Sequence, residues 1–211
     1  MYDSERRSRS YYEGRARWYD WSNRIAALLR GTSDSGERGK AICRLNLKHN
    51  HRVLEVCAGT GSNLALMAKQ IGPEGRLFGL DISPSMLSRC RRKLRHRKVE
   101  ADLVQGEAAH LPFADDAFDA VLHHGGIAEF GDKRGAIDEM MRVAKPDAKV
   151  VICDAGVSTD RKLSLTNRLL LKFQPVYEQP PPVELVPSRA KDLHLTWFHG
   201  GGWYMIEFVN P

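Results

Sequence analysis

The segment Arg52–Leu64, RVLEVCAGTGSNL, constrains the fold more than any other part of the chain. Residues 53–56 are apolar apart from Glu55, a composition typical of a buried strand. Small residues follow at 58–61, and from Asn63 onward the apolar residues recur at helical spacing. A strand, a glycine turn and a helix in this order place backbone N–H groups and a helix N-terminus around a polar ligand.

The residues after the turn indicate a ligand without a pyrophosphate. A dinucleotide-binding turn needs a third small residue three positions after Gly61, where this chain has the bulky Leu64. No P-loop lysine follows either, which disfavours a nucleoside triphosphate. Asp81 ends the next apolar run, LFGLD, about twenty residues later. A carboxylate there can accept hydrogen bonds from both hydroxyls of a ribose.

Three stretches together resemble a known family. Glu55–Gly61, Asp81 and the run GEAAHLPFADDAFDAV at 106–121 are similar to class I S-adenosylmethionine-dependent methyltransferases. Upstream, residues 19–23 (YDWSN) resemble the entry motif of the ubiquinone/menaquinone C-methyltransferases, with phospholipid N-methyltransferases nearly as close. The resemblance runs from about Tyr12 to Asp154 and resumes at the C-terminal hairpin.

The resemblance implies that S-adenosyl-L-methionine is the cofactor. The glycine turn would lie along its methionine and ribose, Asp81 would take the ribose hydroxyls, and Glu107 with Ala108 would meet the adenine. Glu107 stands where relatives have a shorter Asp or Asn, which is a mild departure. The expected cofactor contacts are Tyr19, Glu55, Ala58, Gly59, Thr60, Gly61, Asp81, Ile82, Met86, Glu107, Ala108 and His123.

The acceptor side of the site is less defined. Methyl transfer from a sulfonium needs a nucleophile with a free lone pair, so a proton acceptor is expected beside the substrate. His124 is the candidate base because histidine titrates near neutrality, although a packed, hydrogen-bonded histidine is the alternative. Adjacent strand residues point to opposite faces, so at most one of His123 and His124 faces the methyl group. The other candidates are Tyr12, Tyr19, Glu129 and Asp154.

Metal chemistry has little support in the sequence. Two adjacent histidines without a spaced third ligand make a poor metal site, so none is expected. The four cysteines are scattered without CxxC spacing, which indicates neither a zinc site nor a disulfide framework.

Strands and helices alternate through the middle of the chain. The pattern predicts an α/β fold with a doubly wound, mostly parallel sheet. Ser83 before Pro84 is a typical helix start. The runs at 193–198 and 203–209 predict a C-terminal antiparallel hairpin, after a segment that is shorter than in relatives. The expected order is strand 53–57, helix 62–71, strand 76–81, helix 84–97, strand 101–105, strand 118–123, helix 133–144 and strand 148–154.

The N-terminal part is expected to form a helical lid over 1–46, with 47–211 as the cofactor-binding core of a single domain. Residues 1–10 are polar and arginine-rich, so we expect a frayed arm there. Apolar spacing over 11–29 predicts one amphipathic helix or two short ones. The glycine-rich 31–39 is expected to be a loop, followed by a helix over 40–47.

The net charge of +6 is concentrated in one segment. Residues 89–98 hold seven arginines or lysines and no acid, so the remainder of the chain is close to neutral. This local basicity disfavours a nucleic-acid-binding protein. It leaves two interpretations of 89–98: a solvated helix face, or a patch that docks on anionic lipid or RNA. With no apolar membrane-length run, a cytoplasmic protein is expected, with peripheral membrane contact through 89–98 as the alternative.

The substrate is expected to be a small or lipid-like molecule. C-methylation of a prenylated quinol is favoured, and N-methylation of a phospholipid or amine is the alternative. The shortened 155–192 segment, which ordinarily builds the substrate wall, also leaves open a non-catalytic cofactor-binding regulator. Within it, 163–173 is expected to be a helix, either packed on the core or lying at a membrane interface. The sequence does not define the oligomeric state.

Overall fold

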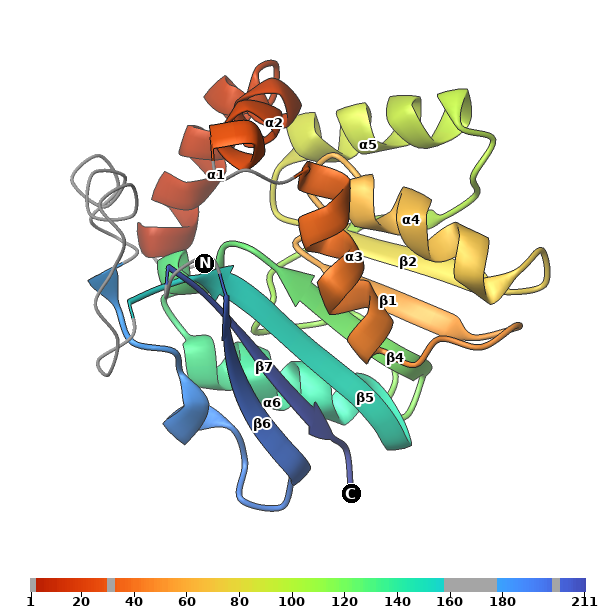
Figure 1. The fold of residues 1–211 in the computed structure, drawn as a ribbon, viewed down its shortest axis with the longest axis vertical. Coiled ribbons are helices and arrows are strands. Elements are labelled where there is room, and N and C mark those ends of the chain that lie inside the picture. Colours follow the sequence, from red (N-terminus) through yellow and green to blue (C-terminus); the bar gives the residue numbers. More distant parts are fainter. Residues whose placement is uncertain (1–2, 30–32, 158–177, 199–201) are drawn as a thin grey trace.

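The computed structural model describes residues 3–29, 33–157, 178–198 and 202–211 of the chain. Its centre is a seven-stranded sheet in the order β3-β2-β1-β4-β5-β7-β6, with helices on both faces (Figure 1). The strands are β1 Arg52–Val56, β2 Arg76–Asp81, β3 Asp102–Gln105, β4 Phe118–His124, β5 Ala144–Ala155, β6 Lys191–Phe198 and β7 Trp203–Val209. The helices are α1 Asp3–Arg15, α2 Tyr19–Leu29, α3 Asp34–Arg44, α4 Ser62–Ile71, α5 Pro84–His96 and α6 Lys133–Val143, with the short 3-10 helices η1 Ile127–Glu129 and η3 Val183–Leu185.

The strand pairing confirms the predicted fold class. Strands β1 to β5 pair in parallel, whereas β7 runs antiparallel to both β5 and β6. The strand order reverses between β1 and β4, so the crossover connections leave in opposite directions from this point. In open α/β sheets a ligand site forms outside the carboxyl ends of the strands at such a reversal. The glycine turn after β1 lies at this position.

Alternation along the strands divides the core into two layers. Leu54, Val121 and Ile152 belong to the layer that packs against α6. Their neighbours Val53 and Ala120 belong to the opposite layer, which packs against α3, α4 and α5. Both faces of the central strands are therefore buried, as a parallel sheet covered on both sides requires.

Two predictions about the N-terminal part were wrong. Residues 3–10 are not an arm, because they belong to α1, where arginine and glutamate favour a helix despite the lack of an apolar stripe. Most of 31–39 is not a loop either, because α3 begins at Asp34. Ser33 caps it by accepting a hydrogen bond from Gly36 N at 3.1 Å, and Asp34 pairs with Arg38 one turn later. The region 11–29 does form two helices, as one of the two interpretations had it.

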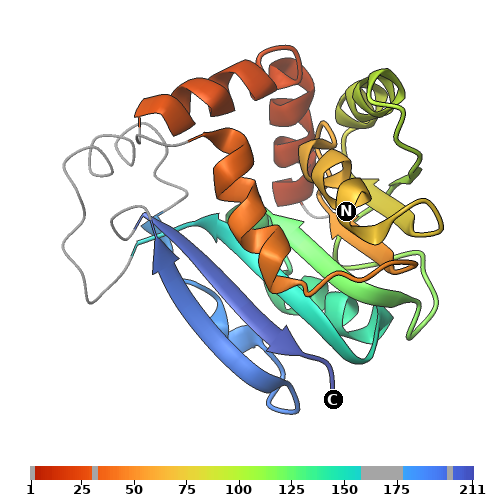
Figure 2. The ribbon, with the colours of Figure 1, turned by 45° about the vertical axis from the view of Figure 1, so that its right-hand side comes forward.

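The three N-terminal helices have different surroundings. Ala41 and Ile42 of α3 are buried in the core layer with α4, so α3 is part of the core packing. Helices α1 and α2 lie above the carboxyl ends of the strands, close to α5 (Figures 1 and 2). The proposal of a lid therefore applies to α1 and α2.

Between β5 and β6, the structure describes the chain up to residue 157 and again from Glu178. The prolines at 180–182 adopt neither helix nor strand, and η3 follows directly. The predicted helix over 163–173 lies outside the described residues.

Candidate active site

The turn after β1 requires residues that tolerate left-handed backbone. Gly59 has φ of 54° and Gly61 has φ of 77°, a region that costs other residues about 1–2 kcal/mol. Gly61 has a second constraint, because a Cβ there would overlap the Sγ of Cys90 on α5. The turn thus lets α5 pack closely behind it. Cys57 also has a positive φ, of 62°, although it is not glycine.

Asp81 points toward this turn and is held by two backbone groups. The N–H of Gly59 donates to Asp81 Oδ2 at 2.8 Å, and the N–H of Ser83 donates to Oδ1 at 2.9 Å. Burial raises the pKa of Asp81 above its usual value, and the lowering effect of these backbone hydrogen bonds offsets this only in part. Each carboxylate oxygen keeps a further lone pair for a ligand hydroxyl.

A cavity opens in front of Asp81 at the carboxyl ends of β1, β2 and β4. Its wall combines apolar side chains with a few carboxylates and exposed backbone, which is typical of a small-molecule site. The described residues lining it are Tyr12, Tyr19, Cys57, Gly59, Asp81, Ile82, Met86, Gly106, Glu107, Ala108, Ala109, Gly125, Gly126, Glu129, Phe130 and Asp132.

Seven of the twelve expected cofactor contacts lie in that wall: Tyr19, Gly59, Asp81, Ile82, Met86, Glu107 and Ala108. The other five, Glu55, Ala58, Thr60, Gly61 and His123, lie around the cavity but are not among the described residues that line it.

Glu55 is buried below the turn. Asn63 Nδ2 donates to its Oε1, and its Oε2 has no hydrogen-bond partner among the described residues. Arg38, itself buried, donates to Asn63 Oδ1 at 3.1 Å and pairs with Asp34. Burial is the main cause that raises the pKa of Glu55 to about 8, against the lowering effects of Asn63 and Arg38. Glu55 therefore supports the turn from beneath, and its Oε2 is left without a hydrogen-bond partner among the described residues.

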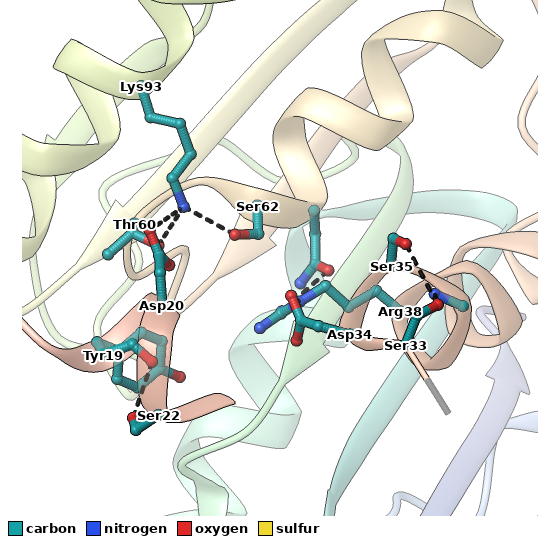
Figure 3. Close-up of polar contacts among 12 residues, drawn as sticks. Tyr19, Asp20, Ser22, Ser33, Asp34, Ser35, Arg38, Thr60, Ser62 and Lys93 are labelled. Atoms are coloured by element: carbon teal, nitrogen blue, oxygen red, sulfur yellow. Dashed lines mark hydrogen bonds and ion pairs between the residues drawn. The ribbon is translucent and has the colours of Figure 1, made fainter. Parts of the chain in front are cut away.

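Thr60 joins the turn to the N-terminal helices. Its hydroxyl donates to Asp20 Oδ1 of α2 at 2.6 Å, and Lys93 Nζ of α5 donates to Thr60 Oγ1 at 2.7 Å (Figure 3). Lys93 also pairs with Asp20 at 2.7 Å and donates to Ser62 at 2.8 Å. Burial opposes ionisation of Asp20, but the bonds from Lys93 and Thr60 prevail and lower its pKa. Helix α2 is thus fastened over the turn.

The two histidines occupy opposite faces of β4, as the alternation predicts. His123 lies on the α6 side, where Nδ1 donates to the carbonyl of Val56 at 3.1 Å, and burial lowers its pKa to about 4. His124 lies on the other side, with its ring centroid 5.5 Å from that of Trp203. Burial and the charge of Arg38 lower the pKa of His124 to about 3. Such a ring is a weak base at neutral pH, and His124 is not among the described residues that line the cavity. The structure therefore does not favour the prediction that His124 is the base.

A carboxylate and a phenol meet inside the cavity instead. Tyr12 Oη of α1 donates to Glu129 Oε1 of η1 at 3.0 Å, and both side chains line the cavity. Asp154 lies behind η1, where it accepts hydrogen bonds from the N–H groups of Gly126 and Ala128 at 3.1 and 3.0 Å. Burial raises the pKa of Asp154 to about 6. Asp154 thus holds the loop that carries Glu129, and Glu129 itself faces the cavity.

The sequence interpretation missed seven lining residues: Cys57, Gly106, Ala109, Gly125, Gly126, Phe130 and Asp132. The adjacent glycines were the available signal, because a glycine pair at the carboxyl end of a parallel strand often marks a ligand site. Their φ angles of 87° and 111° require glycine, although a Cβ would find open space at either position.

The residues present fit S-adenosylmethionine. Asp81 offers free lone pairs beside the Gly59 backbone, and Ile82 and Met86 provide an apolar surface suited to adenine. Glu55 retains an unsatisfied acceptor oxygen close to the turn. These features provide the polar and apolar groups that an adenosyl amino acid requires.

Comparison with known proteins agrees with this site. A family model described as a methyltransferase domain matches residues 53–147. A demethylmenaquinone methyltransferase of Lactobacillus johnsonii is 36% identical over 149 residues, covering 70% of this chain and 60% of that protein. The enzyme of the same name from a Geobacillus species is 32% identical over 161 residues, covering 75% of this chain and 68% of that protein.

Solved structures share the fold at low sequence identity. Haemonchus contortus phosphoethanolamine N-methyltransferase 2, in complex with S-adenosyl-L-methionine, matches with a TM-score of 0.69 at 16% identity, covering 83% of this chain and 52% of that one. Geranyl diphosphate C-methyltransferase from Streptomyces coelicolor matches with a TM-score of 0.68 at 11% identity, covering 85% of this chain and 78% of that one.

The sequence identity, the matched domain and the sheet order lead to one conclusion about class. The chain belongs to the class I S-adenosylmethionine-dependent methyltransferase family. Its curated relatives include the demethylmenaquinone methyltransferases, and the chain spans about 60 to 68% of the length of the two described above.

Proposed function

We propose that this chain binds S-adenosyl-L-methionine and transfers its methyl group to a carbon of a prenylated quinol. The observation that carries the proposal is Asp81, held by Gly59 and Ser83 in the wall of a cavity at the strand-order reversal. The quinol acceptor is supported by the relatives named demethylmenaquinone methyltransferase at 31–38% identity.

The residues divide the work as follows. When bound, S-adenosylmethionine supplies an electrophilic methyl group on a sulfonium. Asp81 and Gly59 hold the adenosyl group, and this positioning accounts for much of the rate because the displacement needs reacting atoms in line. Tyr12 and Tyr19 cover the cavity from the N-terminal helices and exclude water from the charged centre.

A quinol carbon becomes nucleophilic when a ring hydroxyl loses its proton. Glu129 is the proton acceptor that the geometry favours, because its carboxylate lines the cavity and its orientation is fixed by Tyr12. Asp154 acts as a positioning residue through the backbone of Gly126 and Ala128. His124 stays a second candidate, and the variants Glu129→Gln and His124→Gln separate the two.

Turnover on a panel of demethylated prenyl quinols, phospholipids and small amines tests the proposal. S-adenosylhomocysteine release with a quinol, and mass addition on a ring carbon, is the expected result. Turnover with an amine or phospholipid but not with a quinol would show that the proposed acceptor is wrong and that the methyltransferase activity is right. Cofactor binding without turnover on any acceptor would instead favour a binding regulator.

A membrane-embedded acceptor would have to reach the cavity from a lipid bilayer. In the described ranges the structure has no helix of sufficient length and hydrophobicity to cross one.

A further inference from the structure

Large apolar side chains are exposed at the start of α2. Trp18, in the turn before the helix, and Trp21 are 65% and 62% exposed, and Leu28 near the end of the helix is 70% exposed. The two indole rings lie 6.2 Å apart, edge to face. Arg24 is exposed between Trp21 and Leu28 on the same stripe of the helix. Exposed tryptophans interleaved with arginine are typical of a helix at a membrane interface.

Helix α5 supplies positive charge beside this stripe. Arg91, Arg92 and Arg95 are exposed on it, and Arg97 and Lys98 follow directly. The sequence from 84 to 99 contains no acid. Figures 1 and 2 show α2 and α5 at the same end of the molecule. Arg24 and Leu28 of α2 line one hollow with Lys93 of α5 and the adjacent Arg97, so the two helices share a surface, which we call the α2–α5 surface.

An ion pair fixes the relative position of the two helices. Lys93 is the cation of α5 that turns inward, where it meets Asp20 of α2 at 2.7 Å (Figure 3). The aromatic stripe and the arginine face are therefore joined across the glycine turn and move together. This arrangement separates Lys93 from the neighbouring arginines, which were expected to share one solvated or docking face.

A polar hollow of about 380 Å³ lies between the helices. Asp20 and Asp34, its carboxylates among the described residues, are paired with Lys93 and Arg38, whereas Arg24 and Arg97 have no ion-pair partner in the described part of the chain. The hollow also presents hydroxyls from three serines. The described residues lining it are Asp20, Arg24, Leu28, Ser33, Asp34, Ser35, Arg38, Ser62, Leu66, Lys93 and Arg97.

We propose that the α2–α5 surface docks on an anionic lipid bilayer, with Trp18, Trp21 and Leu28 at the headgroup level and the α5 arginines on lipid phosphates. Charge complementarity selects this partner, because the surface carries uncompensated cations while its apolar groups need a partner without hydrogen-bonding demands. The hollow between Arg24 and Arg97 accepts a headgroup phosphate. The biological role of this docking rests on the proposed function. Docking through this surface brings the helices that cover the cavity to the membrane in which a prenyl quinol is dissolved.

Cosedimentation of the full chain with vesicles tests the inference. Vesicles of phosphatidylcholine with about 30 mol% phosphatidylglycerol should bind the protein at low salt, and high salt should release it. The double variant Arg91→Ser/Arg95→Ser should partition about thirtyfold more weakly, since each basic residue near an anionic surface contributes about five- to sixfold. Trp18→Ser/Trp21→Ser should weaken binding several-fold and abolish a blue shift of the tryptophan emission.

Matched controls on the far side of the molecule should bind like the wild type. Arg189→Ser/Lys191→Ser removes the same charge beside and on the edge strand β6, and Leu193→Ser/Leu195→Ser removes exposed apolar groups of β6, which are 40% and 41% exposed. Absent binding, equal binding to pure phosphatidylcholine, or equal losses in the controls would overturn the inference. So would RNA binding through the same arginines without vesicle binding.

Two readouts keep this inference separate from the proposed function. Calorimetry with S-adenosylmethionine, and turnover of a quinol dispersed in detergent, should be unchanged in the surface variants. Lost vesicle binding with intact detergent turnover identifies a docking defect. Vesicle binding by the wild type without any turnover would instead contradict the proposed function and leave the surface intact.

Discussion

Lys93 of α5 and Asp20 of α2 form an ion pair at 2.7 Å directly above Thr60 of the glycine turn. Their side chains are 19% and 38% exposed, so water screens the pair only in part. The contact joins α2, the glycine turn and the basic helix α5 into one cluster.

Replacing Lys93 by Met should speed cofactor release. Without the ammonium, α2 loses its ion pair with α5 and, in the described part of the chain, is held to the turn only by the hydrogen bond from Thr60 to Asp20. It should therefore open more often, and the dissociation rate of S-adenosylhomocysteine should rise about 3- to 10-fold. Stopped-flow displacement measures this rate. Arg92→Met, one residue away and exposed, removes the same charge outside the cluster and should leave the rate unchanged. Equal rates in both variants would show that the ion pair does not hold the lid.

Glu129→Gln should lower turnover by about 100-fold or more and leave cofactor affinity intact, because the amide cannot accept a proton. Tyr12→Phe should cause a smaller loss, since it removes the hydrogen bond that orients the carboxylate. His124→Gln serves as the comparison and should retain most activity. The opposite ranking, with His124→Gln inactive and Glu129→Gln active, would restore the histidine as the base.

Glu55→Gln should remove a pH dependence of stability. The pKa of Glu55 is about 8 in the folded chain and about 4.5 when unfolded, so in this window the native state retains a proton that the unfolded state releases. The free energy of unfolding therefore falls as pH rises from about 4.5 to 8. Above pH 8 and without cofactor, the Gln variant should exceed the wild type by roughly 2 kcal/mol or more, and near pH 4.5 the two should agree. Urea unfolding at several pH values checks this, and parallel curves would contradict it.

Gly61→Ala should destabilise the fold by about 2–4 kcal/mol. Its φ is left-handed, and the added Cβ would overlap Cys90 Sγ, so backbone strain and overpacking add together. Gly39→Ala is the matched control, because a Cβ there meets nothing within 4 Å and the residue lies inside α3. This control should gain about 0.5–1 kcal/mol from helix propensity. Equal urea midpoints in the two variants would contradict the packing argument.

The sequence predicted the central sheet well because each element carries a local signal. Ser83 caps α5 as expected by accepting a hydrogen bond from Met86 N, and the switch to helical period after Gly61 marks α4. The N-terminal helices were harder. Helix α1 has no apolar stripe. Helix α3 starts in a stretch rich in glycine and serine, a composition typical of loops, and its cap residue Ser33 belongs to that stretch.

The sequence could predict those site residues that belong to a local motif, as Asp81 does. It could not predict contacts between residues that only the folded chain brings together. Thr60 was expected along the cofactor, but its hydroxyl bonds to Asp20, forty residues earlier. Tyr12 and Glu129 are 117 residues apart in the chain, so their hydrogen bond required the fold.

Calorimetric titration of Asp81→Asn with S-adenosylmethionine tests the central claim most directly. The claim is that this carboxylate, held by Gly59 and Ser83, binds the ribose hydroxyls of the cofactor. The dissociation constant should rise about 30-fold or more, because two charge-assisted hydrogen bonds are weakened, while Asp102→Asn on the edge strand should bind like the wild type. An unchanged dissociation constant in a folded Asp81→Asn variant would contradict the account.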